Sequence, residues 1–157
     1  EGNSGDAWFV ATRMLREGDK IINAKEGEGA IDQASWERRE KEAFTRYADE
    51  VLAREAKSEE TGHNWELQML FDEFRFREDG YQAEKPSDLS RRVAEAVISR
   101  HLRTPGREWV ALINATEAKM PDDYIAQLRR QVKPNAIDRA KKWWEGVRAK
   151  ASKVVAK

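Results

Sequence analysis

The chain has 157 residues, of which 39% are hydrophobic and 37% are charged, and its formal net charge is zero. This length suits a single domain with a polar surface, and the longest unbroken apolar runs, residues 7–11 and 109–113, are far shorter than the roughly 20 residues of a membrane span. The absence of cysteine excludes disulfides, thiol catalysis and cysteine-bound zinc, and it is typical of a reducing compartment.

The first third of the chain predicts two helices joined by a charged linker. Residues 1–5 indicate a loose arm, and residues 6–23 indicate a helix whose first backbone N–H groups Asp6 can cap. The linker over residues 25–29 follows no apolar strand and lacks the third glycine of a dinucleotide-binding loop, so phosphate binding is not expected there. The second helix, which begins at Asp32 or Ser35 and ends near residue 57, has an apolar face and a charged remainder that is typical of a solvated surface.

Residues 64–79 satisfy two patterns at once. The alternation that is typical of a strand is shown by Trp65, Leu67, Met69 and Phe71. Helical spacing is shown by Leu67, Leu70, Phe71 and Phe74. Because an isolated strand would have nothing to pair with, and no second strand signal occurs elsewhere, we expect a helix. Its apolar residues cover most of its sides, which predicts a position at the centre of the domain or beneath a partner.

Three more helices are predicted before the last one. Residues 87–103 begin with a serine that can cap a helix, and residues 104–119 begin with a threonine–proline pair, the preferred order for a helix start. A shorter helix is expected over residues 121–132. We therefore predict an all-α fold, an irregular multi-helix bundle of about six to seven helices that forms one domain over residues 1–157.

The C-terminal segment, residues 135–157, predicts one long helix with two different faces and with Asn135 as its cap. Its continuous apolar stripe, which we expect to be buried, comprises Ile137, Ala140, Trp144, Val147, Ala151 and Val154. A second face gathers basic side chains with a tryptophan at its border, and the partner-binding surface that we predict there consists of Trp143, Arg139, Lys142, Lys150, Lys153 and Lys157. Gly146 lies in the helix interior at a cost of about 1 kcal/mol relative to alanine.

The zero net charge hides a division between two halves. Residues 1–84 carry 21 acidic and 12 basic side chains, whereas residues 85–157 carry 8 acidic and 17 basic ones. Such a division indicates either that the acidic half and the basic half neutralise each other internally or that each meets charged partners. Both interpretations stay open at the level of sequence.

Candidate catalytic groups are few. His101 lies near a predicted helix C-terminus, where the helix dipole favours an imidazolium, and its apolar neighbours indicate a structural residue. His63 completes a single Glu60-x-x-His63 pair, whereas a di-iron bundle needs two such pairs and two further glutamates. No nucleophile elbow, phosphate loop or zinc-protease motif occurs, so we expect no enzyme, no metal and no cofactor.

One short run of residues resembles a DNA-binding element. Residues 141–150, with the order Lys-Lys-Trp-Trp-Glu-Gly-Val-Arg-Ala-Lys, loosely resemble the recognition helix of homeodomains. The resemblance implies a helix that enters the major groove and whose second tryptophan packs in the core. Gly146 stands where that family has its adenine-reading asparagine, which argues against sequence-specific reading.

The sequence therefore predicts a non-catalytic structural or adaptor subunit that docks into a larger protein assembly through its amphipathic, basic C-terminal helix. The alternative is a helical protein that binds nucleic acid non-specifically through its basic half, residues 85–157. We expect protein partners, no membrane span and an intracellular location. That location is the cytoplasm, or an organelle such as the mitochondrion if the absent initiator methionine reflects removal of a transit peptide.

Overall fold

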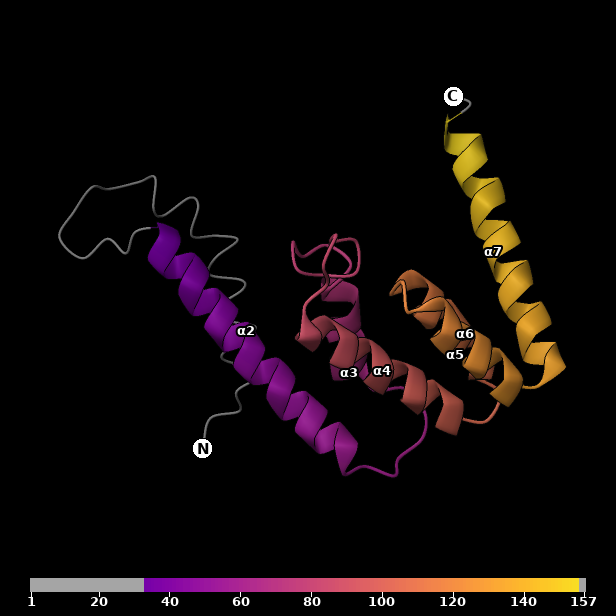
Figure 1. The fold of residues 1–157 in the computed structure, drawn as a ribbon, viewed down its shortest axis with the longest axis horizontal. Coiled ribbons are helices and arrows are strands. Elements are labelled where there is room, and N and C mark those ends of the chain that lie inside the picture. Colours follow the sequence, from indigo (N-terminus) through magenta and orange to yellow (C-terminus); the bar gives the residue numbers. More distant parts are fainter. Residues whose placement is uncertain (1–32, 156–157) are drawn as a thin grey trace. The chain divides into compact units, whose positions relative to one another are not determined.

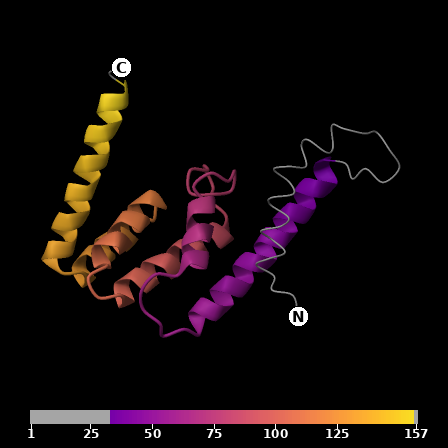
Figure 2. The same cartoon turned by 180° about the vertical axis from the view of Figure 1, so that it is seen from behind.

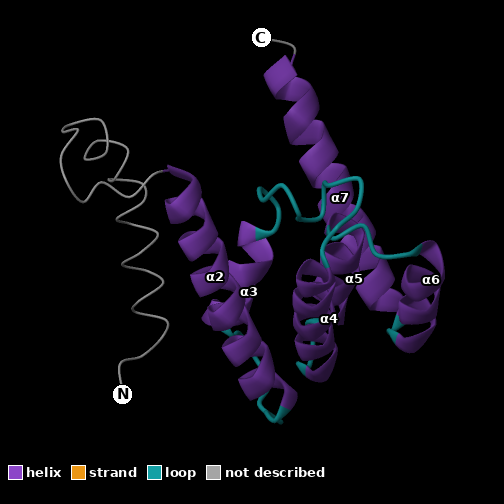
Figure 3. Cartoon of the chain, turned by 60° about the vertical axis from the view of Figure 1, so that its left-hand side comes forward, coloured by secondary structure: helices purple, strands orange, loops and turns teal. Residues whose placement is uncertain are grey.

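The structure, a computed structural model, describes residues 33–155 and divides the chain into two compact units, Glu1–Ala53 and Arg54–Lys157. The described residues form six helices and no strand, which confirms the all-α prediction (Figures 1 and 3). The predicted arm over residues 1–5 and the predicted helix over residues 6–23 lie outside the described residues. The prediction of a single domain stays a prediction, and each unit is described here by itself.

Helix α2 (Gln33–Ala56) accounts for the described part of the first unit and confirms the helix predicted over residues 32–57. Its buried side chains recur at the spacing of one helix face, and they are Phe44, Tyr47, Ala48, Val51 and Leu52. The last turn of α2, from Arg54 onward, belongs to the second unit.

Helix α3 (Trp65–Glu73) is shorter than predicted. Asn64 caps it, since its side-chain oxygen accepts the Leu67 N–H at 3.2 Å, so the helical interpretation of this segment is confirmed. The prediction that it continues to residue 79 was wrong, because the chain turns back after Phe74. The Phe74 carbonyl accepts the backbone N–H of Tyr81 at 3.0 Å, and the Tyr81 ring packs 6.1 Å from the Phe74 ring.

Gly80 makes this turn possible. A Cβ atom at that position would lie 1.9 Å from the Phe74 carbonyl oxygen, so only glycine allows the two backbone segments to approach so closely. A glycine six residues after a helical phenylalanine gives no periodic signal, which is why the apolar pattern alone overestimated the length of α3.

Helix α5 (Glu108–Glu117) is the centre of the second unit. It packs against α4 (Asp88–Arg103), α6 (Asp122–Gln131) and α7 (Pro134–Val155), and its five consecutive residues 111–115 are all buried. Helix α3 packs against α4. The central position that the sequence predicted for residues 64–79 therefore belongs to α5.

Two helix starts differ from those predicted. Helix α5 begins at Glu108 and not at the Thr104-Pro105 pair. The Thr104 hydroxyl donates to the Arg100 carbonyl at 2.8 Å, so this side chain stabilises the C-terminus of α4 instead of capping α5. Helix α7 begins at Pro134, which takes the first helical position itself, and the Ala136 N–H donates to the Lys133 carbonyl at 2.9 Å. Asn135 is therefore inside the helix and is not its cap.

Helix α7 is continuous through Gly146, and its C-terminal part extends away from α5 and α6 in both views of the ribbon (Figures 1 and 2). Within residues 33–155, no helix combines the length and the apolar character that crossing a membrane would require.

Candidate docking surface

Helix α7 has a packed beginning and an exposed continuation. Ala136 and Ala140 are buried, and α7 contacts α5. Beyond these residues Trp144 is only half-buried, Val147 is 38% exposed and Ala151 is exposed. The prediction that the whole apolar stripe is buried was therefore wrong.

Helix length explains the exposure. Helix α5 has 10 residues and α7 has 22, which correspond to about 15 Å and 33 Å along the helix axis at a rise of 1.5 Å per residue. Helix α5 therefore ends before α7 does, and the second half of the stripe has no helix of this unit to cover it. We refer to residues 143–151 of α7 as the free half.

The aromatic residues of the free half contact each other. The Trp143 and Trp144 rings lie edge to face, with their centroids 4.8 Å apart. Trp143 remains 36% exposed and lies beside the apolar stripe, in the position that the helical spacing predicts. An exposed tryptophan held in place by a second one is pre-organised for contact, because little side-chain freedom is lost when a partner covers it.

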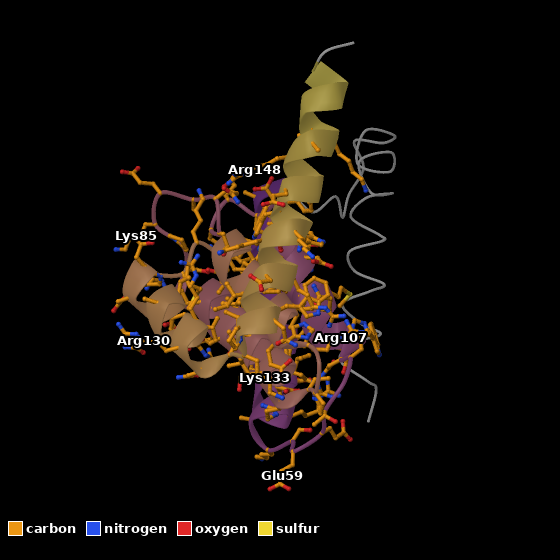
Figure 4. The ribbon with its side chains drawn as sticks, turned by 90° about the vertical axis from the view of Figure 1, so that its right-hand side faces the viewer. Glu59, Lys85, Arg107, Arg130, Lys133 and Arg148 are labelled. Atoms are coloured by element: carbon orange, nitrogen blue, oxygen red, sulfur yellow. The ribbon has the colours of Figure 1, made fainter. Side chains whose placement is uncertain are left out.

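The basic residues predicted as partner-binding lie on the surface of α7. Arg139, Lys142 and Lys150 are exposed, and none of them forms an ion pair or a hydrogen bond with the part of the chain that the structure describes. In Figure 4, Lys133 marks the start of α7 and Arg148 marks its free half. The Lys153 side chain and the whole of Lys157 lie outside the described residues.

Ion pairs within the second unit join the acidic half to the basic half, and the most buried of those described surround Glu55. The carboxylate of Glu55, at the end of α2, pairs with Arg100 at 2.7 Å and with Arg103 at 2.6 Å, both on α4. Arg100 also donates to the Gly62 carbonyl at 3.0 Å, so the loop after α2 is held by the same cluster. This cluster joins a residue of the acidic half to residues of the basic half, whereas Arg139, Lys142 and Lys150 of α7 form no ion pair with the residues that the structure describes.

The structure gives His101 a neutral state. Burial, together with the positive charge of Arg107 and the neighbouring His63 and Arg100, lowers the pKa of His101 from 6.5 to about 4. The expectation of an imidazolium at this helix C-terminus was wrong, because burial is the largest influence on the pKa of His101 and it favours the neutral ring. The predicted structural role fits this burial.

A small cavity lies beside His101. It has a volume of about 10 Å³, enough for about one water molecule, and Arg100, Asn64 and Gln68 are among its lining residues. The Nδ1 atom of His101 is buried without a hydrogen-bond partner. Among the described residues, no three His, Asp or Glu side chains gather closely enough to hold a metal ion. The cavity therefore has room for no more than about one water molecule beside His101.

Sequence reasoning missed two exposed aromatic residues. Trp65 is 59% exposed at the start of α3, and Phe76 is 86% exposed in the turn that follows it. Helix α3 ends at Glu73, so Phe76 lies outside its apolar face, and no periodic pattern in the sequence marks that end. No known protein family, curated protein or solved structure matches this chain.

Proposed function

We propose that the chain is a non-catalytic docking subunit of a larger protein assembly and that the free half of α7 is its docking surface. One observation carries the proposal: Val147 and Ala151 continue the buried stripe of α7 into a region where they are exposed, beside Trp143 and near Lys142 and Lys150, which form no ion pair with the described residues. An apolar strip with a polar border marks an interaction surface on a soluble domain.

The composition of the surface supports the proposal. Tryptophan and arginine are the residue types that most often supply the binding energy of protein interfaces, and Trp143 and Arg139 are both exposed on α7.

The test is the native mass of the chain in extracts of its own source. The wild-type chain, with a mass of 18.1 kDa, is expected to migrate with a much larger assembly. The Val147→Asp variant places a charge in the apolar strip, and it is expected to migrate as the free chain. Val147 is exposed, so this variant keeps its fold.

The matched control is Phe76→Asp, which changes an exposed apolar residue away from α7 and is expected to stay with the assembly. A wild-type chain that migrates alone, or a Val147→Asp variant that remains in the assembly, would contradict the proposal.

Non-specific binding of nucleic acid through residues 85–157 is the second candidate, and it is favoured by the exposure of Arg139, Lys142 and Lys150, which form no ion pair within the described part of the chain. Each phosphate that these cations neutralise would release a counterion, so binding to an arbitrary duplex would weaken steeply as salt is added. A salt titration tests this candidate, and a slope near zero excludes it.

A further inference from the structure

The apolar strip on α7 has the repeat of a coiled coil. Ala140, Trp144, Val147 and Ala151 follow one another at spacings of four, three and four residues, which are those of the a and d positions of a heptad. Helix α5 ends before this seam does, so the seam from Trp144 onward is open to a helix from another molecule.

The seam is bordered by positive charge on both sides. In the register set by the a and d residues, Lys141 lies at an e position and Lys150 at a g position, where coiled coils place the charges that choose their partners. Both lysines are exposed and form no ion pair with the described residues. Arg139 and Lys142 occupy the c and f positions, on the outer side of the helix.

This border argues against a second copy of the chain as the occupant. The e and g positions between residues 141 and 150 are Lys141, Trp143, Arg148 and Lys150, and none of them is acidic. Each copy of α7 would therefore bring three cations and no carboxylate to the edges of a shared seam, where like charges oppose pairing.

The size of the seam residues indicates how large the partner's side chains must be. Val147 and Ala151 are small for d and a positions, so longer apolar side chains such as leucine would fill the space above them. The Trp144 ring is half-buried at the N-terminal end of the free half, where a partner's side chains would pack against it.

From this geometry we propose that the occupant of the free half is an acidic amphipathic helix of another protein, with leucine-like residues on the seam and glutamate or aspartate facing Lys141 and Lys150. The inference rests on the proposed docking function and names the chemistry of its partner. Opposite charges at the edges select this helix, and the apolar seam holds it.

The test uses two synthetic helical peptides that both carry leucine at a and d positions. One has glutamate at every e and g position, and the other has lysine there. Fluorescence anisotropy measures the binding of each labelled peptide to the full chain. The acidic peptide is expected to bind at least about tenfold more tightly than the basic one, because two border charges change from attraction to repulsion.

A pair of double variants then tests the register. Lys141→Glu with Lys150→Glu reverses the charges at the border, and it is expected to weaken binding of the acidic peptide about tenfold and to strengthen binding of the basic one. Arg139→Glu with Lys142→Glu is the matched control, since it makes the same charge change on the outer side of the same helix, and its effect is expected to be less than about threefold.

Three results would overturn the inference. Equal weakening by the two double variants would show general attraction between charges and no coiled-coil register. A dimer of the wild-type chain in sedimentation, lost in Val147→Asp, would make a second copy the occupant. Displacement of the acidic peptide by an arbitrary DNA duplex at equal concentration would make the surface a site for nucleic acid.

The native-mass experiment separates this inference from the proposed function. If Val147→Asp releases the chain from its assembly and Lys141→Glu with Lys150→Glu does not, then docking through α7 stands and the acidic partner is wrong. If neither variant releases the chain, both proposals fail.

Discussion

The packed part of the second unit, residues 54–132, and the free half of α7 use positive charge in opposite ways. The Arg100 side chain is 6% exposed and is held by the Glu55 carboxylate at 2.7 Å and the Gly62 carbonyl at 3.0 Å. Lys150, which lies in the free half and belongs to the same basic half of the sequence, is exposed and has no ion pair with the described residues. A net charge therefore says little about function until each cation has been assigned its partner.

Aromatic residues show the same contrast. In the packed part, the Arg75 guanidinium lies over the Phe71 ring at 5.5 Å and pairs with Glu117 at 2.6 Å, and the Tyr81 ring lies 4.9 Å from the Phe71 ring. These contacts fasten the end of α3 and the turn after it to the end of α5. In the free half, the rings of Trp143 and Trp144 contact each other, which leaves Trp143 open to a partner.

The largest expected effect comes from breaking the buried cluster. Glu55→Ala removes the buried carboxylate that pairs with Arg100 and Arg103 and leaves Arg100 with the more distant, exposed carboxylate of Glu60 at 3.5 Å, and breaking a buried ion pair in this way costs about 3 to 5 kcal/mol. We expect chemical denaturation to show a loss of unfolding free energy of this size. Glu59→Ala, which removes an exposed carboxylate from the neighbouring loop, is the control and should change stability by less than about 0.5 kcal/mol. Equal effects of the two variants would mean that the Glu55 cluster does not contribute to the free energy of unfolding.

A glycine in the packed part gives the next largest effect. Gly80→Ala would place a Cβ atom 1.9 Å from the Phe74 carbonyl oxygen, so the backbone of the turn must move. We expect a destabilisation of about 3 kcal/mol, at the upper end of the cost of overpacking, measured by chemical denaturation. The Tyr81 ring should also loosen from Phe71, which near-ultraviolet circular dichroism would detect. An unchanged stability would show that the turn is free to shift.

The pH dependence of the free energy of unfolding tests whether protonation of His101 destabilises the packed part. The pKa of His101 is lowered from 6.5 to about 4 in the folded chain, so between these values the unfolded chain binds a proton that the folded chain does not. Stability is therefore expected to fall by about 2 kcal/mol as pH falls from 6.5 towards 4, after discounting for screening by solvent, and to lose nothing more from this residue below pH 4.

The His101→Gln variant should lose this part of the pH dependence, as measured by the difference in its denaturation midpoint from wild type across the same pH range. His63→Gln, which changes the exposed histidine nearby, should keep most of it. The same slope in wild type and His101→Gln would contradict burial of a neutral imidazole.

Much of the fold could be predicted from periodicity, because the buried face of a helix repeats every three or four residues and this repeat is visible in a single sequence. The apolar face of α2 and the capping of α4 by Ser87 are of this kind. Turn geometry was harder, since the end of α3 depends on contact between Gly80 and Phe74, which are apart in sequence and show no pattern. The central place of α5 depends on which helices surround it, and no local signal contains that information.

The candidate surface was predictable in its residues but not in its shape. Helical spacing put Trp143 beside the apolar stripe and Arg139, Lys142 and Lys150 on the exposed side, and the structure places them so. Helical spacing could not reveal that Val147 is exposed, because this exposure depends on the shorter length of α5 and on where α5 contacts α7. The partners of Arg100 and Arg103 were equally hidden, since Glu55 lies 45 and 48 residues away along the chain.

The smallest expected effect sharpens the comparison between the two glycines. A Cβ atom at Gly146 would have nothing within 4 Å, in contrast to Gly80, so Gly146→Ala adds a methyl group without a clash. Alanine restricts the unfolded chain and favours the helix, so we expect a gain in the stability of α7 of up to about 1 kcal/mol, measured as slower hydrogen exchange of its amides. Gly146 occupies the c position, away from the seam, so the same variant should bind the acidic peptide at least as tightly as wild type. Weaker binding would mean that the partner approaches the backbone at Gly146, and the interface would then lie on the outer side of α7 and not on its apolar strip.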